Sequence, residues 1–513
     1  MDRIRRMSDD ATSSVNSYDA VPYPGQPYRQ THPQWLAALA QLLSIPAPPP
    51  QSCRVLELGC CDGGNLIAMA VGLHNAKFVG VDYSPVQIEI GRKTVDHLKL
   101  SNVDLHALSI LDIPSDWGPF DYILCHGVFS WVPAGVQEKI LEICSTMLAP
   151  DGIAYISYNA LPGWHLRGIV RDMMRYHALR FDSPERQIQE AKLILDFIAQ
   201  HAVGSHAVAY SMFLKSEAEM LRKLPDHYLY HEHLEDHSEP FYFHEFVEHA
   251  RGYDLEYLAE AALGSMAPTN FGPVADRALS AIATNLIELE QFMDFLGNRT
   301  FRETLLRHTG RAVATYTIEP QSLGRLYITG KCRPQTQVVD LRPEKPVTFE
   351  SYQNKHPITT SNPLLKAALL CLVNEFPGSI SFDSLVERAQ GQLLKVNVNA
   401  ADTKRAAEQL GKALLQLLTT SSLLEISSLP ACFTTTPGAK PLASSLARLQ
   451  AETSMSMVTL RHDIATLGES ESAVLKLLDG TRTTGEIAAV LGRPEKEIGQ
   501  MIDRLARYAL LVF

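Results

Sequence analysis

The chain lacks the long apolar runs that mark membrane proteins and secretory leaders. No hydrophobic stretch among its 513 residues approaches the roughly 20 residues that a membrane-spanning helix needs. The N-terminal MDRIRRMSDDATSSVNS is basic and then polar, with no apolar segment behind it. We therefore expect residues 1–17 to form a disordered tail rather than a signal peptide, and the protein to be cytoplasmic and free of membranes.

Cysteine and basic side chains are also scarce. Eight cysteines in so long a chain do not make a disulfide framework, and they favour a reducing compartment. The 46 Lys and Arg residues are outnumbered by 57 Asp and Glu, and the resulting net charge of −11 argues against binding nucleic acid. The length of the chain favours roughly three domains.

Short β-rich runs alternate with helical patterns between about Arg54 and Tyr158. This alternation predicts a Rossmann-like α/β fold, in which a parallel sheet is covered on both faces and binds ligands at the carboxyl ends of its strands. A helical insertion follows, before the last strands of the same sheet. For those last elements we expect a long helix over NLIELEQFMDFLGNRTFRETLL and a strand at RLYITG.

The predicted domain boundaries follow from these patterns. The two C-terminal parts each combine helices with short strands, as small winged-helix-like α+β domains do. We expect a cofactor-binding domain over 18–167, a helical insertion over 168–240 for substrate, regulation or dimerisation, the end of the sheet and a regulatory region over 241–330, and winged-helix-like domains over 363–428 and 445–513.

The segment VLELGCCDGGN, residues 55–65, predicts a strand, a glycine-rich turn and a helix. Its glycines let the backbone approach a ligand, but the second glycine of a dinucleotide fingerprint is absent. The spacing of Glu57, Gly59 and Gly63 fits better with the loop of S-adenosylmethionine (SAM) enzymes. Cys60 and Cys61 lack the spacing of a zinc or redox pair, so we interpret them as small loop residues, one of them in place of the missing glycine.

Acidic residues follow the next two predicted strands. Asp82 ends KFVGVD, where a carboxylate can accept hydrogen bonds from both ribose hydroxyls of a nucleotide cofactor. Asp112 follows the third strand, where it can meet the adenine amino group. The alternative is that these acids are surface residues or helix caps. The order and spacing of the four elements favour the cofactor site.

Several motifs together resemble one family. They are SYDAVPYPGQPYRQTHP (17–33), LELGCCDGGN (56–65), HGVFSWVP (126–133), SYNALPGWH (157–165) and YHEHLEDHSEPFYFHEFVEHA (230–250). The chain resembles the bacterial class I SAM-dependent methyltransferases that carry a methyltransferase regulatory domain. Known members include protein-lysine methyltransferases that act on an outer-membrane protein. Cys61 and Asp62 depart from the small neutral residues usual in this family.

The resemblance implies a set of cofactor-binding residues, and separately we consider a homodimer as the assembly of the chain. The implied SAM-binding residues are Glu57, Gly59, Cys60, Gly63, Asn65, Asp82 and Tyr83, with Asp112 near the adenine and His126, Gly127 and Val128 at the methionine end. No metal is implied.

Aromatic residues gather after the predicted fourth and fifth strands. All four tryptophans precede residue 165, and Trp131 and Trp164 follow strand ends at the expected ligand face. We expect them, with Tyr158 and Asn159, to line an acceptor channel that the helical insertion walls, because aromatic faces favour a cationic amine. Tyr158 or Asn159 would orient the amine or accept its proton. The alternative is that these aromatics pack the insertion on the sheet.

Two further patterns could be mistaken for a metal site and a DNA-recognition helix, but their spacing and charge argue against both functions. Six histidines fall between residues 227 and 249, yet their spacing misses the metal motif H-E-x-x-H, so structural roles are favoured. The C-terminal EKEIGQMIDRLARYALL has balanced charges and lacks the cationic bias of a DNA-recognition helix.

The sequence thus predicts a SAM-dependent methyltransferase, and the family resemblance implies that it acts on protein, most readily on lysine side chains. Two alternatives stay open: N- or O-methylation of a small molecule, and a catalytically silent SAM-binding regulator.

Overall fold

The computed structural model describes residue 19 and residues 21–202, 208–310, 318–352, 357–398 and 402–513. The tail expected over 1–17 lies outside these described residues. None of the helices in these ranges combines the length and the hydrophobicity of a membrane-spanning segment.

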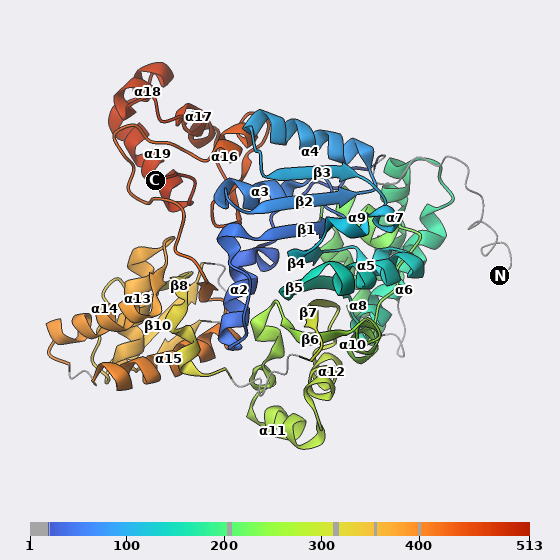
Figure 1. Ribbon diagram of the computed structural model, residues 1–513, viewed down its shortest axis with the longest axis horizontal. Helices are drawn as coiled ribbons and strands as arrows, with labels where there is room; N and C mark the ends of the chain where they lie inside the picture. The colour runs from blue at the N-terminus through green and yellow to red at the C-terminus, as the bar shows by residue number, and fades with distance from the viewer. Residues whose placement is uncertain (1–18, 20, 203–207, 311–317, 353–356, 399–401) are drawn as a thin grey trace.

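A seven-stranded sheet in the order β3-β2-β1-β4-β5-β7-β6 forms the centre of the described chain (Figure 1). Its first five strands are parallel, and β7 runs antiparallel to both of its neighbours. The strand order reverses between β1 and β4, which is where open α/β sheets bind ligands. The strands are β1 (Arg54–Leu58), β2 (Lys77–Asp82), β3 (Val103–Ala107), β4 (Phe120–Cys125), β5 (Leu148–Asn159), β6 (Leu255–Glu260) and β7 (Phe301–His308). The predicted Rossmann-like fold is confirmed.

Helices cover both faces of this sheet, and alternate side chains of each strand enter two separate apolar cores. Val55 and Tyr155 pack against one set of helices, whereas Leu56 and Ile156 pack against the other. The first face carries α2 (Pro33–Leu42), α3 (Gly64–Gly72) and α4 (Pro85–Leu98), and the second carries α5 (Ala134–Met147) and α10 (Phe243–Arg251). Because both faces are buried, the central strands β1, β4 and β5 contain long runs of buried residues.

The helical insertion leaves the sheet after β5 and has a small apolar core of its own. Val170, Leu195, Leu214 and Leu229 belong to this core, one from each helix. The helices are α6 (Gly163–Ala178), α7 (Pro184–His201), α8 (Val208–Leu221) and α9 (Asp226–His233), so the insertion begins five residues earlier than the expected Gly168.

Two predictions about the end of the sheet are wrong. FRETLLRH forms strand β7, because α12 (Leu286–Gly297) ends where Asn298 takes the left-handed φ of 46°. The predicted strand RLYITG exists, but as β8 (Tyr327–Gly330) it pairs with β12 and β13 in a different sheet. Helix α11 (Pro273–Ile282) lies between β6 and α12.

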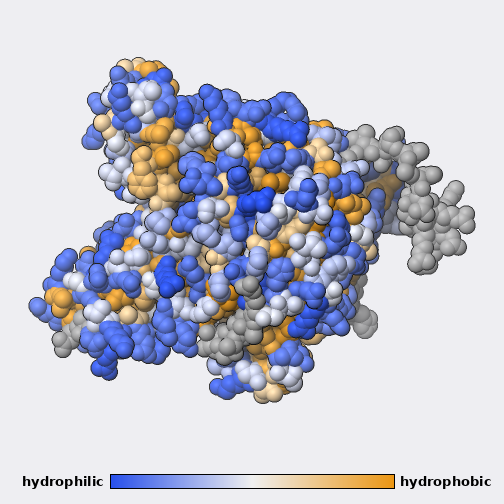
Figure 2. All heavy atoms as spheres, viewed as in Figure 1, coloured by the Kyte–Doolittle hydropathy of each residue, from blue (hydrophilic) through white to orange (hydrophobic). Residues whose placement is uncertain are grey.

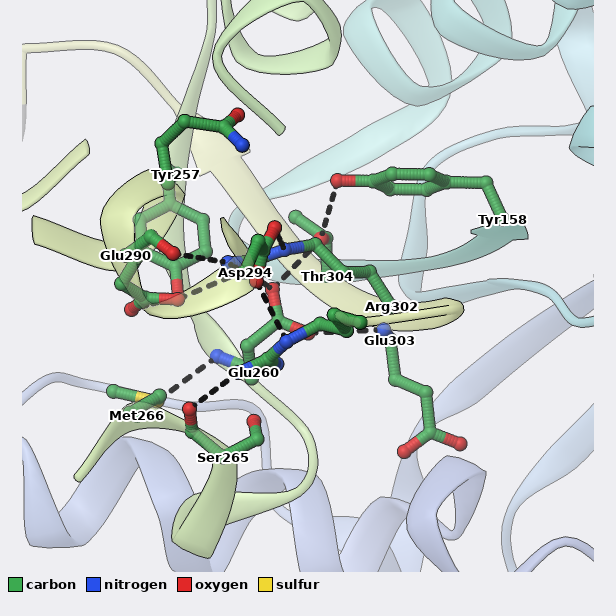
Figure 3. A network of polar contacts seen from close by, with 12 residues as sticks. Tyr158, Tyr257, Glu260, Ser265, Met266, Glu290, Asp294, Arg302, Glu303 and Thr304 are labelled. Atoms are coloured by element: carbon green, nitrogen blue, oxygen red, sulfur yellow. Dashed lines mark hydrogen bonds and ion pairs between the residues drawn. The ribbon is translucent and has the colours of Figure 1, made fainter. Parts of the chain in front are cut away.

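Buried charges fasten β7 to β6 and α12 (Figure 3). The guanidinium of Arg302 lies 2.7–2.8 Å from carboxylate oxygens of Glu260, Glu290 and Asp294, and every one of these side chains is at most 1% exposed. Such a group is costly to bury unless its charges are paired, so the network fixes these three elements together.

The rest of the described chain forms two lobes beside the sheet (Figure 1). The middle domain contains β8, β12 (Ile380–Ser381), β13 (Leu424–Ser427), α13 (Pro363–Glu375), α14 (Phe382–Lys395) and α15 (Thr403–Thr420). A small sheet of β9 (Cys332–Pro334), β10 (Val347–Ser351) and β11 (Ile358–Thr360) lies between β8 and α13 in the sequence. The C-terminal domain contains α16 (Ser445–Gln450), β14 (Ser456–Val458), β15 (Ile464–Thr466), α17 (Glu469–Leu477), α18 (Thr484–Leu491) and α19 (Glu495–Arg507). Figure 2 shows a notch between the two lobes.

Candidate cofactor and acceptor site

The glycine-rich loop lies between β1 and α3, at the point where the strand order reverses. Gly59 and Gly63 have φ angles of 73° and 72°, in the left-handed region that favours glycine. At Gly59, a Cβ atom would come within 2.4 Å of Val128 Cγ2 at the end of β4. The loop therefore brings bare backbone against the strand end where the methionine part of a cofactor is expected.

The two cysteines differ in where their side chains lie. Cys60 is buried beneath the loop, and its sulfur faces Gly80 of β2, so only its backbone is left for a ligand. Cys61 has a φ of 52° and thus takes the conformation of the missing glycine. Burial raises the pKa of both thiols well above the ordinary value of 9, which makes them poor metal ligands and poor nucleophiles.

Glu57 presents an unpaired acceptor at this loop. Its Oε1 accepts a hydrogen bond of 2.7 Å from Asn65 Nδ2, whereas its Oε2 is buried with no hydrogen-bond partner among the described residues. Burial raises the pKa of Glu57 to about 8. A buried acceptor without a partner is unfavourable, and the α-ammonium group of SAM would satisfy it. The residues present therefore fit this cofactor.

Asp82 ends β2, next to this loop. Its Oδ1 accepts the amide N–H of Ser84 and its Oδ2 that of Cys61, both at 2.9 Å. These bonds orient the carboxylate and leave one lone pair on each oxygen for ribose hydroxyls. Tyr83, which follows, is 72% exposed, and Asp112 is exposed in a short 3₁₀-helix after β3. The structure thus brings the three residues expected at the nucleoside end to neighbouring strand ends.

His126 and Gly127 lie at the end of β4, where contacts from β5 hold them. His126 Nδ1 lies 2.8 Å from the Tyr155 hydroxyl, and Gly127 N donates to Ser157 Oγ at 2.7 Å. The Tyr155 hydroxyl in turn donates to Glu303 of β7 at 3.1 Å. Burial lowers the pKa of His126 to about 4, so its imidazole is neutral. Nothing in the sequence segments around Tyr155 and Glu303 distinguishes these two residues from core positions.

An N-terminal strap, residues 21–32, crosses the same loop. Tyr28 N donates to Asn65 Oδ1 at 3.0 Å, and the Tyr28 ring packs on His126 with ring centroids 3.9 Å apart. Thr31 Oγ1 accepts from Asn65 Nδ2 at 3.0 Å. In the sequence, this segment is recognisable only as a family motif. Its contacts show that it covers the cofactor loop.

The residues expected in the acceptor channel divide into two groups. Trp131 and Trp164 meet edge to face at 5.8 Å, and Asn159 and Trp164 are buried with side-chain nitrogens that no described residue pairs. Tyr158 requires a correction. It is 1% exposed, stacks on Phe246 of α10, and receives a hydrogen bond from Thr304 at its hydroxyl oxygen (Figure 3). The ring is a core residue on the other face of the sheet.

Helix α9 of the insertion lies against the N-terminal strap. The rings of His227 and His231 contact Tyr23 edge to face at 5.2 and 5.9 Å, and His231 Nε2 lies 2.7 Å from the carbonyl oxygen of Val21. These histidines therefore have structural contacts. Among the described residues, no three His, Cys, Asp or Glu side chains are grouped as a metal site would require.

Three family models match the chain. A "Methyltransferase domain" matches residues 50–209, a "Predicted methyltransferase regulatory domain" matches 225–308, and a "PKMT, C-terminal winged helix domain" matches 439–498. These matches cover the sheet, the region of α9 to β7, and the C-terminal domain.

Relatives also match the chain, one of them over nearly its whole length. An uncharacterised protein of Rickettsia prowazekii is 36% identical over 488 residues, which cover 94% of this chain and 86% of that protein. A second one is 42% identical over 242 residues, 47% of this chain and 96% of its own length. Among solved structures, PKMT2 from Rickettsia typhi has a TM-score of 0.85 and 30% identity, covering 96% of this chain and all of its own, and it has also been solved in complex with AdoHcy.

Proposed function

Because the chain belongs to the family of class I SAM-dependent methyltransferases that carry a methyltransferase regulatory domain and a PKMT winged helix domain, we propose that it transfers methyl groups from SAM to lysine side chains of a protein. When bound, SAM supplies a methyl group on a sulfonium, which a nucleophile displaces in line. The protein must position the acceptor nitrogen, exclude water and receive its proton.

The observation that favours an amine as acceptor is the carboxylate of Glu232 in α9, which lies near the strap and is not hydrogen-bonded to its nearest cation. Glu232 is 17% exposed, and its Oε1 lies 3.8 Å from Arg167 Nη1, too far for a hydrogen bond. Burial raises the pKa of Tyr23, and the neighbouring Cys61 and Glu232 raise it further. Tyr23 is therefore near both the cofactor loop and Glu232.

This arrangement suits a lysine side chain. A carboxylate attracts the ammonium, and the aromatic ring of Tyr23 favours a cation. Burial raises the pKa of Glu232 to about 7, although Arg167 and Arg171 oppose this effect. A carboxylate with that pKa can accept the ammonium proton near neutral pH, which leaves the reactive neutral amine.

The activity is tested by incubating the protein with radiolabelled SAM, a bacterial proteome and a metabolite extract. Label in protein, localised to lysine by mass spectrometry, is the expected result. Label only in small molecules would replace the lysine proposal with small-molecule methylation, and no label in either fraction would favour a silent regulator.

The role of Glu232 is tested separately. Glu232→Gln should lower turnover at least tenfold and leave the Kd for SAM within twofold, because the residue serves the acceptor. Glu185→Gln, an exposed acid on α7 of the same insertion, is the matched control and should change neither quantity. Unchanged turnover in the Glu232 variant would remove this carboxylate from the site.

We also propose that the insertion joins two copies of the chain. Its helices expose large apolar side chains that a monomer would leave in water, including Tyr176 at 75%, Leu193 at 59%, Phe197 at 58% and Met212 at 68%. Light scattering should give the mass of a dimer for the wild type and of a monomer for Leu193→Glu/Phe197→Glu. The control is Val490→Glu, at an equally exposed site on α18. A monomeric wild type would refute the proposal.

We propose a cytoplasmic location for the protein on the basis of its cysteines. All eight are free, and most are buried, as in proteins that fold in a reducing environment. This supports a cytoplasmic location.

A further inference from the structure

The C-terminal domain reaches into the cofactor loop. Its hairpin of β14 and β15 has a tip, residues 459–463, and His462 at this tip is 5% exposed. His462 Nε2 lies 2.7 Å from Oδ1 of Asn65, which belongs to the first turn of α3, 397 residues earlier in the sequence. This contact joins a domain outside the sheet to the loop that holds Glu57.

The side-chain amide of Asn65 makes all the hydrogen bonds of which it is capable. Its Oδ1 accepts from Tyr28 N at 3.0 Å and from His462, while its Nδ2 donates to Thr31 Oγ1 at 3.0 Å and to Glu57 Oε1 at 2.7 Å. Four hydrogen bonds saturate an asparagine side chain and leave it one orientation. The orientation of the Glu57 carboxylate is thus set by a residue whose other partners come from the strap and from the C-terminal domain.

The protonation state of His462 follows from these partners. Because Asn65 Oδ1 is an acceptor, Nε2 of His462 must carry a hydrogen. Burial lowers the pKa of His462 well below its ordinary value, and the neighbouring His32 and Arg29 lower it further. The ring is therefore neutral, with its hydrogen on Nε2.

Charged residues on either side of His462 hold the hairpin tip in place. The carboxylate of Glu425 in β13 forms ion pairs with Arg461 of the tip and with Arg29 of the strap, the latter at 2.7 Å. Arg29 also lies 3.3 Å from Asp463. His462 itself has a φ of 60°, a left-handed conformation that is costly for a residue with a side chain. The tip is held in a strained conformation that directs the imidazole at Asn65.

We propose that the C-terminal domain positions the cofactor loop: His462 acts through Asn65 to hold the Glu57 carboxylate ready for the amino group of SAM. His462 is a positioning residue, because it contacts Asn65 and not the cofactor. The inference rests on the cofactor site described above, and it gives the winged-helix-like domain a role in binding SAM.

The first test is the Kd for SAM, measured by calorimetry on the full chain. His462→Ala removes one hydrogen bond to Asn65 and should raise the Kd about five- to thirtyfold, or about 1–2 kcal/mol. His462→Gln restores an N–H donor and should recover most of the affinity. Both variants share the cost of the left-handed backbone, so their difference isolates the donor. Ile464→Ala, on the same hairpin with a side chain 48% exposed, is the matched control and should bind as the wild type does.

The second test asks whether the effect passes through Asn65. Residues that act through one another are not additive, so Asn65→Ala/His462→Ala should bind SAM as weakly as Asn65→Ala alone, within twofold. A merely structural contact predicts a lower melting temperature with an unchanged Kd, or effects that multiply in the double variant, and either result overturns the proposal.

Two further variants keep the outcome clear. If His462→Ala does not fold, His462→Leu, which fills the site without a donor, is compared with His462→Gln by the same criterion. Glu57→Gln tests the cofactor site itself: normal SAM binding in that variant would refute the site, whereas weak binding there with normal binding in His462→Ala would refute only the role of His462.

Discussion

Glu57 provides a prediction in which stability and cofactor binding change in opposite directions. Its folded pKa of about 8 lies above the ordinary value of 4.5 because of burial. Between these two pH values, the unfolded chain releases a proton that the folded chain retains. The stability of the cofactor-free protein therefore falls as pH rises through this window, and Glu57→Gln removes that loss.

The magnitude follows from the same pKa. Each pH unit inside the window costs about 1.4 kcal/mol, so at pH 7 the wild type has lost about 3 kcal/mol relative to pH 4.5. The glutamine amide adds its own cost, because it places an unpaired donor where Glu57 Oε2 lies, but this cost does not depend on pH. The pH dependence of the difference between the two proteins thus reports the carboxylate alone. In exchange, the variant loses the charged partner of the SAM amino group, and its Kd should rise about ten- to a hundredfold.

The assay is thermal unfolding of the cofactor-free wild type and Glu57→Gln from pH 5 to pH 8, with calorimetric titration of SAM at pH 8. We expect the melting temperature of the variant to gain on that of the wild type at every step of increasing pH. A difference independent of pH would show that Glu57 is ionised in the folded protein. Wild-type affinity for SAM in the variant would show that the carboxylate does not contact the cofactor.

Three further changes separate the parts of the molecule. Asp82→Ala removes the acceptor for two ribose hydroxyls and should weaken SAM binding about ten- to a hundredfold by calorimetry; unchanged affinity in a folded variant would remove Asp82 from the site. Trp164→Ala should lower methyl transfer at least tenfold in a turnover assay and leave the Kd for SAM within twofold, and an equal loss of both would contradict an acceptor role. Arg302→Met leaves three buried carboxylates without their cation and should destabilise β6 and β7 by about 3–5 kcal/mol in native-state hydrogen exchange. Arg388→Met, at a half-exposed ion pair with Glu375, should cost less than about 1 kcal/mol, and similar losses in the two variants would refute the account of the buried network.

The elements that carry the proposed cofactor residues could be predicted from the sequence because each of these elements is local. A strand, a glycine turn and a helix follow one another within residues 54–72, and Asp82 ends the next strand, as expected. Parallel strands place their carboxyl ends at one edge, so local order is enough to bring Glu57, Asp82 and His126 together. The role of Cys61 is also local, because its φ angle is that of the glycine that it replaces.

The acceptor side could not be predicted in the same way, because both faces of β5 are buried. In a strand with one wet face, alternating polarity tells which side chains face the ligand. In β5 every residue from Ile153 to Asn159 is buried, so Tyr158 and Asn159 gave no such signal, and they lie on opposite faces. The strand FRETLLRH could not be predicted for a related reason. An arginine at position 302 favours a solvent-exposed helix, and the sequence does not show that three buried carboxylates surround this residue.

The role of the C-terminal domain depends on contacts that no local pattern contains. The balanced charges of its last helix argue against a DNA-recognition role but predict no other contact. The apolar face of α19 is buried in its own domain, and Arg504 on the other side is paired with Glu471 at 2.7 Å. The functional contact comes instead from the hairpin tip, where His462 meets Asn65 across 397 residues of sequence. A single histidine in a turn has no periodicity and no motif, so its importance follows only from what it touches. Since Asn65 is saturated by partners from three separate segments, the cofactor loop takes its final form only when the last domain of the chain has docked.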